Sequence, residues 1–581
     1  MQDSLKDKDN IVVAEDMESI DNITPPSLQH IPNTCAPIST LAHVWTYTQN
    51  PPKWIDSIID LIPRSNLVVK NTLSDCHVEN SQFIPKPRLD YHSVPRTLVC
   101  HDMKGGYIED KFIGPINIGN GYTFYRWSQI DIFVYFSHHL ITIPPLSWIN
   151  VAHTNGVKIL GTFITEWTPG EEICQQIFAN ADTLQMFVDV LVDVCVLFKL
   201  DGWLLNIENK LTDTSALKEF VKSLTEKLHV RRPGSMIIWY DSVIHDGKLK
   251  WQNELNDLNR CFFDLCDGIF INYTWNEDNL KKTVKSAKHR NLDVYVGVDV
   301  FGRNCYGGGN FNTYLAAEKI RQYNLSMAIF AQGWTHETLS QEPADTLFER
   351  FLDRDNTFWR SLWPYLYTHP IAKPFQTFFY IGVDKNWFKL YNQEVQLSRF
   401  LHARERQPED IHVPTLTGTC NCLQLHIHDT YTSCLVTNEN LNSEISYVHH
   451  LFSTDFQING NVIIYYYTKS TKPGNKDDCL NLILLIKHAN GSFRKVLCHS
   501  RKQTILENNQ TVLEMNPSED PDILNMVTYQ YQVPNDWTLR CYLLNIINCR
   551  ILEIGAQVET GKSVCFCGIG FRDATILNKR N

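Results

Sequence analysis

The chain has 581 residues, of which 43% are hydrophobic and 12% aromatic, and its formal net charge is −11 at pH 7. This length predicts two to four domains, and the composition is typical of a well-packed globular protein and excludes a largely disordered one. The negative charge argues against a nucleic-acid-binding protein, which would carry a basic surface, so no nucleic-acid partner is expected.

The sequence predicts neither a secretory signal nor a membrane span. The first 21 residues are acidic, and the longest mainly apolar stretch, residues 184–198, is interrupted by Asp189 and Asp193. The 17 cysteines are odd in number and irregularly spaced, which favours reduced thiols over a disulfide framework. We therefore expect a cytoplasmic protein of the cytosol with no membrane partner.

The amino-terminal region divides into two parts. Residues 1–40 are polar and acidic and show little periodicity, which predicts a loosely ordered arm. Residues 41–88 mix prolines with short apolar runs such as 58–62. This second part is expected to pack on the main domain as an extension.

The next region alternates between two kinds of pattern. Apolar residues at helical spacing occur at 181–199, 215–228, 279–289 and 313–323. Short β-branched apolar runs lie before, between and after these segments, at 97–100, 130–136, 157–164, 201–207, 236–240, 268–273, 293–300 and 327–331. Eight strands alternating with helices predict an α/β fold, a (β/α)₈ TIM barrel, over residues 89–370. A doubly wound sheet is the alternative, but no glycine-rich phosphate turn follows the first strand.

Beyond residue 370 the helical pattern fades. Strand-like runs occur at 374–382, 423–427, 462–467, 480–487, 493–497 and 541–547. Asn490-Gly491 lies between two of them and is a strong signal for a hairpin turn. Residues 371–581 are therefore predicted to form one or two β-sandwich modules.

Polar residues gather at the carboxyl ends of the predicted barrel strands, which meet at one mouth, the place of active sites in this fold. Asn206 and Glu208 are two positions apart on one strand, so their side chains share a face. The alternative is a purely structural role, in which Asn206 and Glu208 cap a solvent-exposed strand end. The other strand ends carry His101, Asp102, His138, His139, Glu166, Trp167, Tyr240, Asp241, Asn272, Trp275, Asp299, Arg303, Gln332 and Trp334.

An acid paired with an amide suggests a particular sugar chemistry. Cleavage of a glycosidic bond usually takes two carboxylates, whereas in a substrate-assisted variant the 2-acetamido oxygen of the sugar attacks the anomeric carbon. Asn206 would then hold the acetamide, with Tyr240 bonding it from the other side. Glu208 would donate a proton to the leaving oxygen and later accept one from water.

Several motifs carry a family resemblance. They are 133–139 (Phe-Val-Tyr-Phe-Ser-His-His), 161–167 (Gly-Thr-Phe-Ile-Thr-Glu-Trp), 201–208 (Asp-Gly-Trp-Leu-Leu-Asn-Ile-Glu), 239–242 (Trp-Tyr-Asp-Ser) and 272–275 (Asn-Tyr-Thr-Trp). Together they resemble the family 85 glycoside hydrolases, especially the animal cytosolic members. These are endo-β-N-acetylglucosaminidases, which cut between the two core GlcNAc residues of N-glycans. The match covers about residues 87–355.

The resemblance implies roles for individual residues. Asn206 resembles the acetamide-orienting residue of the family, Glu208 its general acid/base and Tyr240 its acetamide-binding tyrosine. Gln332 departs from the family, where a proline is expected in a Phe-Ala-Pro-Gly-Trp run. This difference can alter the loop after the last barrel strand, and we expect it to leave the catalytic chemistry unchanged. The implied substrate-binding residues are Trp251, Trp275, Trp167, Asn272, His101, Asp102, Asp299, Arg303 and Trp334.

The expected activity is hydrolysis of the GlcNAc-β1,4-GlcNAc bond in the chitobiose core, with retention of configuration and transglycosylation as a side reaction. N-glycans of glycoproteins or free oligosaccharides would be the partners. No metal or organic cofactor is expected, since the adjacent His138 and His139 face opposite ways on a strand. Two alternatives stay open: a catalytically inactive, lectin-like barrel, and a chitinase-like hydrolase, whose motif has aspartates where this chain has Leu204 and Asn206.

Overall fold

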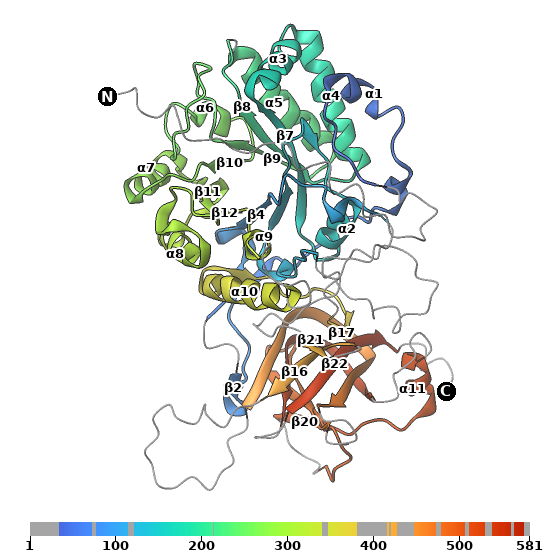
Figure 1. Ribbon diagram of the computed structural model, residues 1–581. Helices are drawn as coiled ribbons and strands as arrows, with labels where there is room; N and C mark the ends of the chain where they lie inside the picture. The colour runs from blue at the N-terminus through green and yellow to red at the C-terminus, as the bar shows by residue number, and fades with distance from the viewer. Residues whose placement is uncertain are drawn as a thin grey trace.

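The computed structural model shows two bodies, a barrel and a β-rich unit, which occupy the upper and lower parts of Figure 1. It describes residues 34–72, 77–113, 121–212, 214–339, 347–379, 415–417, 420–426, 447–471, 478–505, 511–528, 537–558 and 563–574. Residues 380–382 of the predicted strand run 374–382, and most of 371–446, lie outside the described residues. Within the described part of that run the structure has a short strand, β14 (Gln376–Thr377).

The barrel forms as the strand pattern predicts. Within the described residues, eight parallel strands pair side by side, and β5 also pairs with β7, which closes the ring. A short ninth strand, β6 (Ile141–Thr142), lies antiparallel on β7. The eight strands are β4 (Thr97–His101), β5 (Ile132–Tyr135), β7 (Lys158–Glu166), β8 (Gly202–Glu208), β9 (Met236–Tyr240), β10 (Gly268–Ile271), β11 (Val294–Asp299) and β12 (Ser326–Phe330).

Strand alternation decides which side chains can reach the mouth. On β4, Leu98 and Cys100 belong to the apolar cluster that fills the barrel, whereas Val99 packs in the outer layer under the helices. On β8, Leu204 faces the same inner cluster. Because alternate residues share a face, Asn206 and Glu208 lie on the inner side of β8, directly above the packed interior.

Helices cover the outside of the barrel (Figure 1). The four predicted helices are confirmed as α4 (Ala181–Leu197), α5 (Thr214–Arg231), α7 (Glu277–Ala287) and α8 (Thr313–Gln322). Helix α4 starts at Asn180, whose side chain accepts a hydrogen bond from the Thr183 amide, an N-cap that stabilises the first turn. The other barrel helices are α2 (Leu146–Thr154), α3 (Trp167–Ile177), α6 (Arg260–Phe263), α9 (Trp334–Glu337) and α10 (Leu347–Leu362).

The amino-terminal extension joins both bodies. Helix α1 (Leu41–Tyr47) packs on the barrel through Leu41 and Val44. Strands β1 (Leu67–Lys70), β3 (Arg88–Asp90) and β13 (Tyr367–Thr368) form a small sheet, and β2 (His77–Glu79) pairs with the C-terminal unit. The expected loosely ordered arm is wrong for residues 34–40, because Cys35 and Ile38 are buried against the barrel. Residues 1–33 lie outside the described part.

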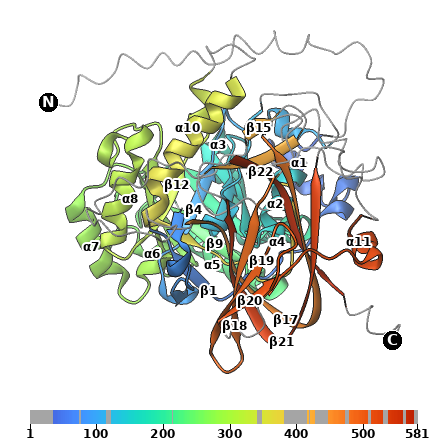
Figure 2. The same cartoon turned by 90° about the horizontal axis from the view of Figure 1, so that it is seen from below.

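The C-terminal unit is a mixed sheet whose long strands β17 and β21 run side by side (Figure 2). Ten strands join it within the described residues, including β2. Asn490-Gly491 forms the predicted turn, joining the antiparallel β18 and β19. Besides α11 (Pro521–Thr528), the elements are β14 (Gln376–Thr377), β15 (Thr415–Thr417), β16 (Cys420–His426), β17 (Tyr447–Ser470), β18 (Asn481–His488), β19 (Phe493–Cys498), β20 (Val512–Met515), β21 (Thr538–Gln557) and β22 (Ser563–Asp573).

A buried charge cluster fixes this unit to the extension. Arg88 of β3 donates to Glu553 of β21 at 2.8 Å, and His450 of β17 contacts the other carboxylate oxygen at 2.9 Å. Glu553 is fully buried. Removal of one partner from such a cluster leaves an uncompensated charge, which costs about 3–5 kcal/mol, so these contacts hold the two bodies in a defined arrangement.

Candidate active site

Glu208 is the last residue of β8 and is half-buried at the barrel mouth. Burial raises the pKa of its carboxyl from the ordinary 4.5 to about 7, and the nearby Glu166 carboxylate acts in the same direction. A hydrogen bond from Asn206 and the charge of His138 oppose this rise. A carboxyl that ionises near neutrality can both give and take a proton during turnover.

The amide of Asn206 is only 4% exposed, and its Oδ1 has no hydrogen-bond partner among the described residues. A buried polar atom left without a partner costs about 1–3 kcal/mol. A residue that merely capped a strand end would satisfy this oxygen within the protein. An acceptor kept open beside an acid is instead suited to a ligand N–H group.

Tyr240 and Asn272 lie in contact at the ends of adjacent strands. The Tyr240 hydroxyl donates to Asn272 Oδ1 at 2.7 Å. Asn272 Nδ2 donates in turn to Asn253 Oδ1 at 2.8 Å, and the Thr274 amide donates to the same oxygen at 3.0 Å. The sequence analysis did not single out Asn253, because this residue lies in the loop between β9 and β10 and is distant in sequence from the ends of both strands.

Asp241 holds this loop in place from below. Its buried carboxylate accepts hydrogen bonds from the Asn253 amide at 2.7 Å, the Gln252 amide at 3.1 Å and Asn259 Nδ2 at 2.9 Å. Burial raises its pKa to about 6. The loop also carries Trp251, whose ring is exposed. By holding the loop, Asp241 fixes the position of Asn253, which supports Tyr240 through Asn272, and the backbone next to Trp251.

A second carboxylate stands beside Glu208. Glu166 ends β7 and is the register partner of Glu208 on the adjacent parallel strand. His138 Nδ1 lies 3.0 Å from Glu166 Oε2, and His138 Nε2 lies 3.9 Å from Asp102 Oδ2. Asp102 therefore lies on the far side of His138 from Glu166. Glu166 and His138 were missed as site residues, although period-two alternation from Ile164 already assigns Glu166 to the inner face.

Asp299 and Arg303 complete the opposite side of the mouth. Arg303 Nε lies 2.7 Å from Asp299 Oδ2, and Arg303 Nη2 lies 3.3 Å from Asp299 Oδ1. The carboxylate also accepts the Phe301 amide at 3.0 Å. Asp299 is buried while the Arg303 side chain is largely exposed. The buried carboxylate therefore holds the Arg303 guanidinium in place at the solvent-exposed surface of the mouth.

Residues 107–387 match the sequence profile described as glycosyl hydrolase family 85. The barrel belongs to this family. The chain is 48% identical over 320 residues to the mouse cytosolic endo-β-N-acetylglucosaminidase, covering 54% of this chain and 42% of the relative. It is 37% identical over 483 residues to the chicken protein of the same name, covering 80% and 64%. The chain thus spans about half the length of the curated relatives it matches.

A plant protein is similar in sequence, and a bacterial structure is similar in fold. Cytosolic endo-β-N-acetylglucosaminidase 1 of Arabidopsis thaliana is 42% identical over 337 residues, covering 55% of this chain and 48% of the relative. The solved glycoside hydrolase domain of Endo-D from Streptococcus pneumoniae R6 superposes with a TM-score of 0.62 at 14% identity. That likeness covers 94% of this chain and 84% of the bacterial one, and it confirms the fold.

The four family-implied tryptophans divide into two exposed and two buried rings. Trp167 is 72% exposed and stacks over His138 with a ring separation of 6.4 Å, and Trp251 is 40% exposed. Trp167 also has a positive φ of 52°, unusual for a bulky residue, and its carbonyl accepts Asn209 Nδ2 at 2.7 Å. Both exposed rings can face a ligand.

Trp275 and Trp334 are not available as direct sugar contacts. Trp275 is 4% exposed; its indole N–H donates to Gly297 O at 2.8 Å, and its ring stacks on Tyr306 at 5.0 Å. Trp334 is 8% exposed and packs between Phe311 and Arg354. Both lie beyond their strand ends, where the chain has turned and carries the ring into the outer layer.

His101 is a correction to the predicted cleft residues. It follows Val99 on the outward face of β4, stacks on Tyr122 at 5.2 Å and contacts Gln332 Nε2 at 2.7 Å. Burial lowers its pKa to about 3, so the imidazole is neutral. Gln332, the departure from the family pattern, also donates to Tyr122 at 3.2 Å. It therefore fills a position behind the barrel wall.

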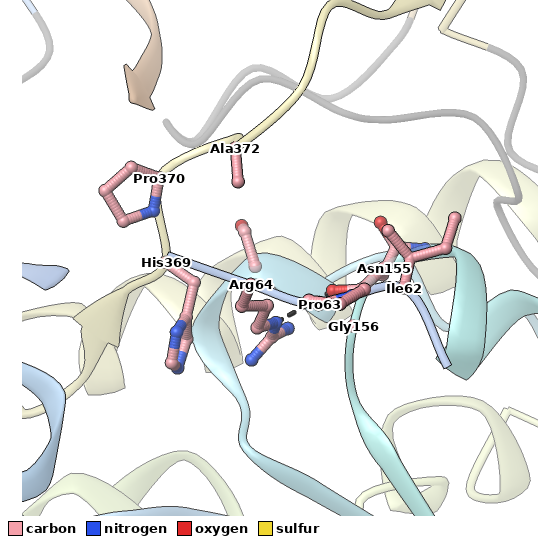
Figure 3. A pocket seen from close by; sticks show the side chains of 9 residues that line it. Ile62, Pro63, Arg64, Asn155, Gly156, His369, Pro370 and Ala372 are labelled. Atoms are coloured by element: carbon pink, nitrogen blue, oxygen red, sulfur yellow. Dashed lines mark hydrogen bonds between the residues drawn. The ribbon is translucent and has the colours of Figure 1, made fainter. Parts of the chain in front are cut away.

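The opposite end of the barrel carries a small pocket (Figure 3). Arg64 fills one side of it and donates to the carbonyls of Asn155, Ile130 and Trp127. Asn155 precedes β7, so the pocket adjoins the amino ends of the strands, whereas barrel active sites form at the carboxyl ends. No cluster suited to a metal ion occurs among the described residues, nor do these contain a helix able to cross a bilayer.

Proposed function

We propose that the chain is a mannosyl-glycoprotein endo-β-N-acetylglucosaminidase that hydrolyses the GlcNAc-β1,4-GlcNAc bond of the N-glycan core and leaves one GlcNAc on asparagine. Family membership and the names of the mouse and chicken relatives support this activity. The observation that carries it is the pairing of a carboxyl of pKa about 7, Glu208, with the open amide oxygen of Asn206 on the same strand face.

The first chemical step forms an oxazolinium ion. The acetamide oxygen of the −1 sugar attacks its own anomeric carbon, the glycosidic C–O bond breaks, and Glu208 gives its proton to the leaving oxygen. Asn206 Oδ1 accepts the acetamide N–H and so holds the attacking oxygen in line. Correct placement of reacting groups can contribute about 7–11 kcal/mol to such a step.

The second step returns the enzyme to its starting state. Glu208, now ionised, takes a proton from water, whose oxygen attacks the anomeric carbon and opens the oxazolinium ring, so that the acetamide regains its neutral form. Two inversions give net retention of configuration. The Tyr240 hydroxyl, positioned by Asn272, bonds the acetamide from the opposite side. An acceptor hydroxyl that replaces water gives transglycosylation, and no metal or organic cofactor takes part.

The substrates follow from the same assignment. N-glycans of glycoproteins and free oligosaccharides both carry the chitobiose core, and the relatives named cytosolic support action in the cytosol. A lectin needs no proton donor, so the raised pKa of Glu208 disfavours the inactive, lectin-like alternative. Chitinase-like cleavage is disfavoured because Leu204, where that motif has an aspartate, is packed in the barrel interior.

Mass spectrometry of a high-mannose glycopeptide tests the proposal. After incubation with the wild-type protein, the product should retain a single GlcNAc on asparagine. A fully deglycosylated peptide would mean amide cleavage and a wrong assignment of the reaction. Saturable binding without any product would support the lectin alternative instead.

A further inference from the structure

The carboxyl ends of β7 and β8 place two acidic residues side by side. Glu166 and Glu208 are register partners on adjacent parallel strands, whose backbones run about 4.8 Å apart. Both follow inner-face residues, Ile164 on one strand and Leu204 on the other. Like charges at this separation disfavour simultaneous ionisation. The reaction outlined above uses only one of the two.

His138 holds the Glu166 side chain in a fixed place. Its Nδ1 contacts Glu166 Oε2 at 3.0 Å, and its Nε2 faces Asp102 Oδ2 at 3.9 Å. The bond to Glu166 and the negative charges of Glu166, Asp102 and Glu208 raise the pKa of the imidazole against the effect of burial. The exposed ring of Trp167 lies over the imidazole. The raised pKa favours a positive charge on His138, next to the Glu166 carboxylate.

We propose that Glu166, oriented by His138, is a positioning residue that keeps Glu208 protonated for the first step of the reaction. The inference rests on the proposed hydrolase function. A general acid must hold its proton until the leaving oxygen takes it. The negative charge of the neighbouring Glu166 raises the pKa of Glu208 and so favours its protonated form. His138 moderates it, because its positive charge allows Glu208 to lose the proton once the bond breaks.

The other groups around Glu208 do not replace this effect. Tyr240 and Tyr273 face Glu208 from the next strands, and burial raises the pKa of both hydroxyls, so they stay neutral. Asn206 favours the ionised form of Glu208 through its hydrogen bond. Beyond His138, burial raises the pKa of Asp102 against the charges of His138 and Arg303, and the neighbouring His139 has a lowered pKa. Among the described residues, Glu166 is the carboxylate whose charge raises the pKa of Glu208.

The pH profile of kcat/KM tests the proposal, since it reports the ionisation of essential groups in the free enzyme. In Glu166→Gln the alkaline limb should move down by about one pH unit. That shift corresponds to about a tenfold loss at pH 8 and less than about a twofold loss at pH 5.5. In His138→Gln the limb should move up, because a positive charge beside Glu208 is removed.

The matched control is Glu337→Gln, which removes another half-buried mouth carboxyl whose charged neighbours are Asp102, Lys104 and Arg303. Its alkaline limb should stay in place. Opposite shifts in the Glu166 and His138 variants separate an electrostatic role from mere loss of structure. An unmoved limb in Glu166→Gln, or shifts of the same sign in both variants, would overturn the proposal.

A second readout does not depend on activity. The melting temperature of Glu208→Gln relative to wild type, followed against pH, reports where Glu208 ionises. When both proteins also carry Glu166→Gln, the difference in melting temperature between the Glu208→Gln variant and its parent should level off at a lower pH. The difference at that plateau should also be smaller. If the wild type cleaves no glycan, the hydrolase function fails while this measurement still decides the role of Glu166. An unchanged plateau would count against that role.

Discussion

Replacement of Glu208 by glutamine should make the protein more stable at alkaline pH while abolishing hydrolysis. The acid is held in a site that disfavours its charged form. Well below pH 4.5, the carboxyl is protonated in both the folded and the unfolded chain and has no differential effect. Between pH 4.5 and about 7 the unfolded chain ionises first, so the wild type loses stability as pH rises. Glutamine has no such dependence.

The size of the effect follows from the pKa. Its rise from 4.5 to about 7 converts fully to about 3.4 kcal/mol, at about 1.36 kcal/mol for each pKa unit. Glu208 is only half-buried, and solvent screening reduces the figure to about 1–3 kcal/mol. In a domain of this size that corresponds to about 2–6 °C in melting temperature.

The assay is differential scanning fluorimetry of wild type and Glu208→Gln at pH 4.5, 6, 7 and 8. The difference between the two melting temperatures should grow from pH 4.5 to about 7 and then level off. The exposed Glu226 of α5 provides the control, since Glu226→Gln should show no comparable growth. A difference for Glu208→Gln that is independent of pH would refute the raised pKa and the desolvated site.

Further variants separate chemistry from binding and from structure. Tyr240→Phe removes the hydroxyl bonded to Asn272 and should lower kcat about 100-fold in steady-state assays while KM changes less than about threefold; a pure KM effect would contradict its role. Trp167→Ala removes an exposed ring and should raise KM about tenfold with an unchanged melting temperature; unaltered KM would exclude the ring from the site. Trp275→Ala should cost about 3–5 kcal/mol in chemical denaturation, whereas an unchanged stability would contradict its burial.

The barrel was predictable because its signal is local and repeated. Each strand is a short apolar run, and all eight predicted runs coincide with observed strands, with small boundary differences such as 130–136 against Ile132–Tyr135. The pair Asn206 and Glu208 was equally accessible, since alternation alone gives their shared face. The hairpin at Asn490-Gly491 follows from turn chemistry.

Other features depend on three-dimensional context. Strand β2 pairs with β17, and no local pattern in the extension indicates a partner so distant in the sequence. The motif that contains Trp275 gives its position but not the direction of its ring, which is set by the turn after β10 and the stacking on Tyr306. His101 was misplaced for a simpler reason: the residue alternation on β4 already assigned it to the outward face.

The role of Glu166 required the register of two strands. The sequence contains the residue at a strand end, yet only the pairing of β7 with β8 and the contact with His138 link it to Glu208. Asn253 likewise lies on a loop whose path is fixed by its hydrogen bonds to Asp241 and Asn272, residues at the ends of two different strands. Side-chain networks of this kind follow from the assembled fold.

The most direct test of the account compares two donors with Asn206→Ala. An intact N-glycan requires the acetamide to attack, whereas a preformed glycan oxazoline already contains that bond. Mass spectrometry should show hydrolysis of the intact glycan reduced by at least about 100-fold and transfer from the oxazoline to a GlcNAc acceptor retained. Normal cleavage of the intact glycan by the variant would contradict substrate-assisted catalysis with Asn206 as its guide.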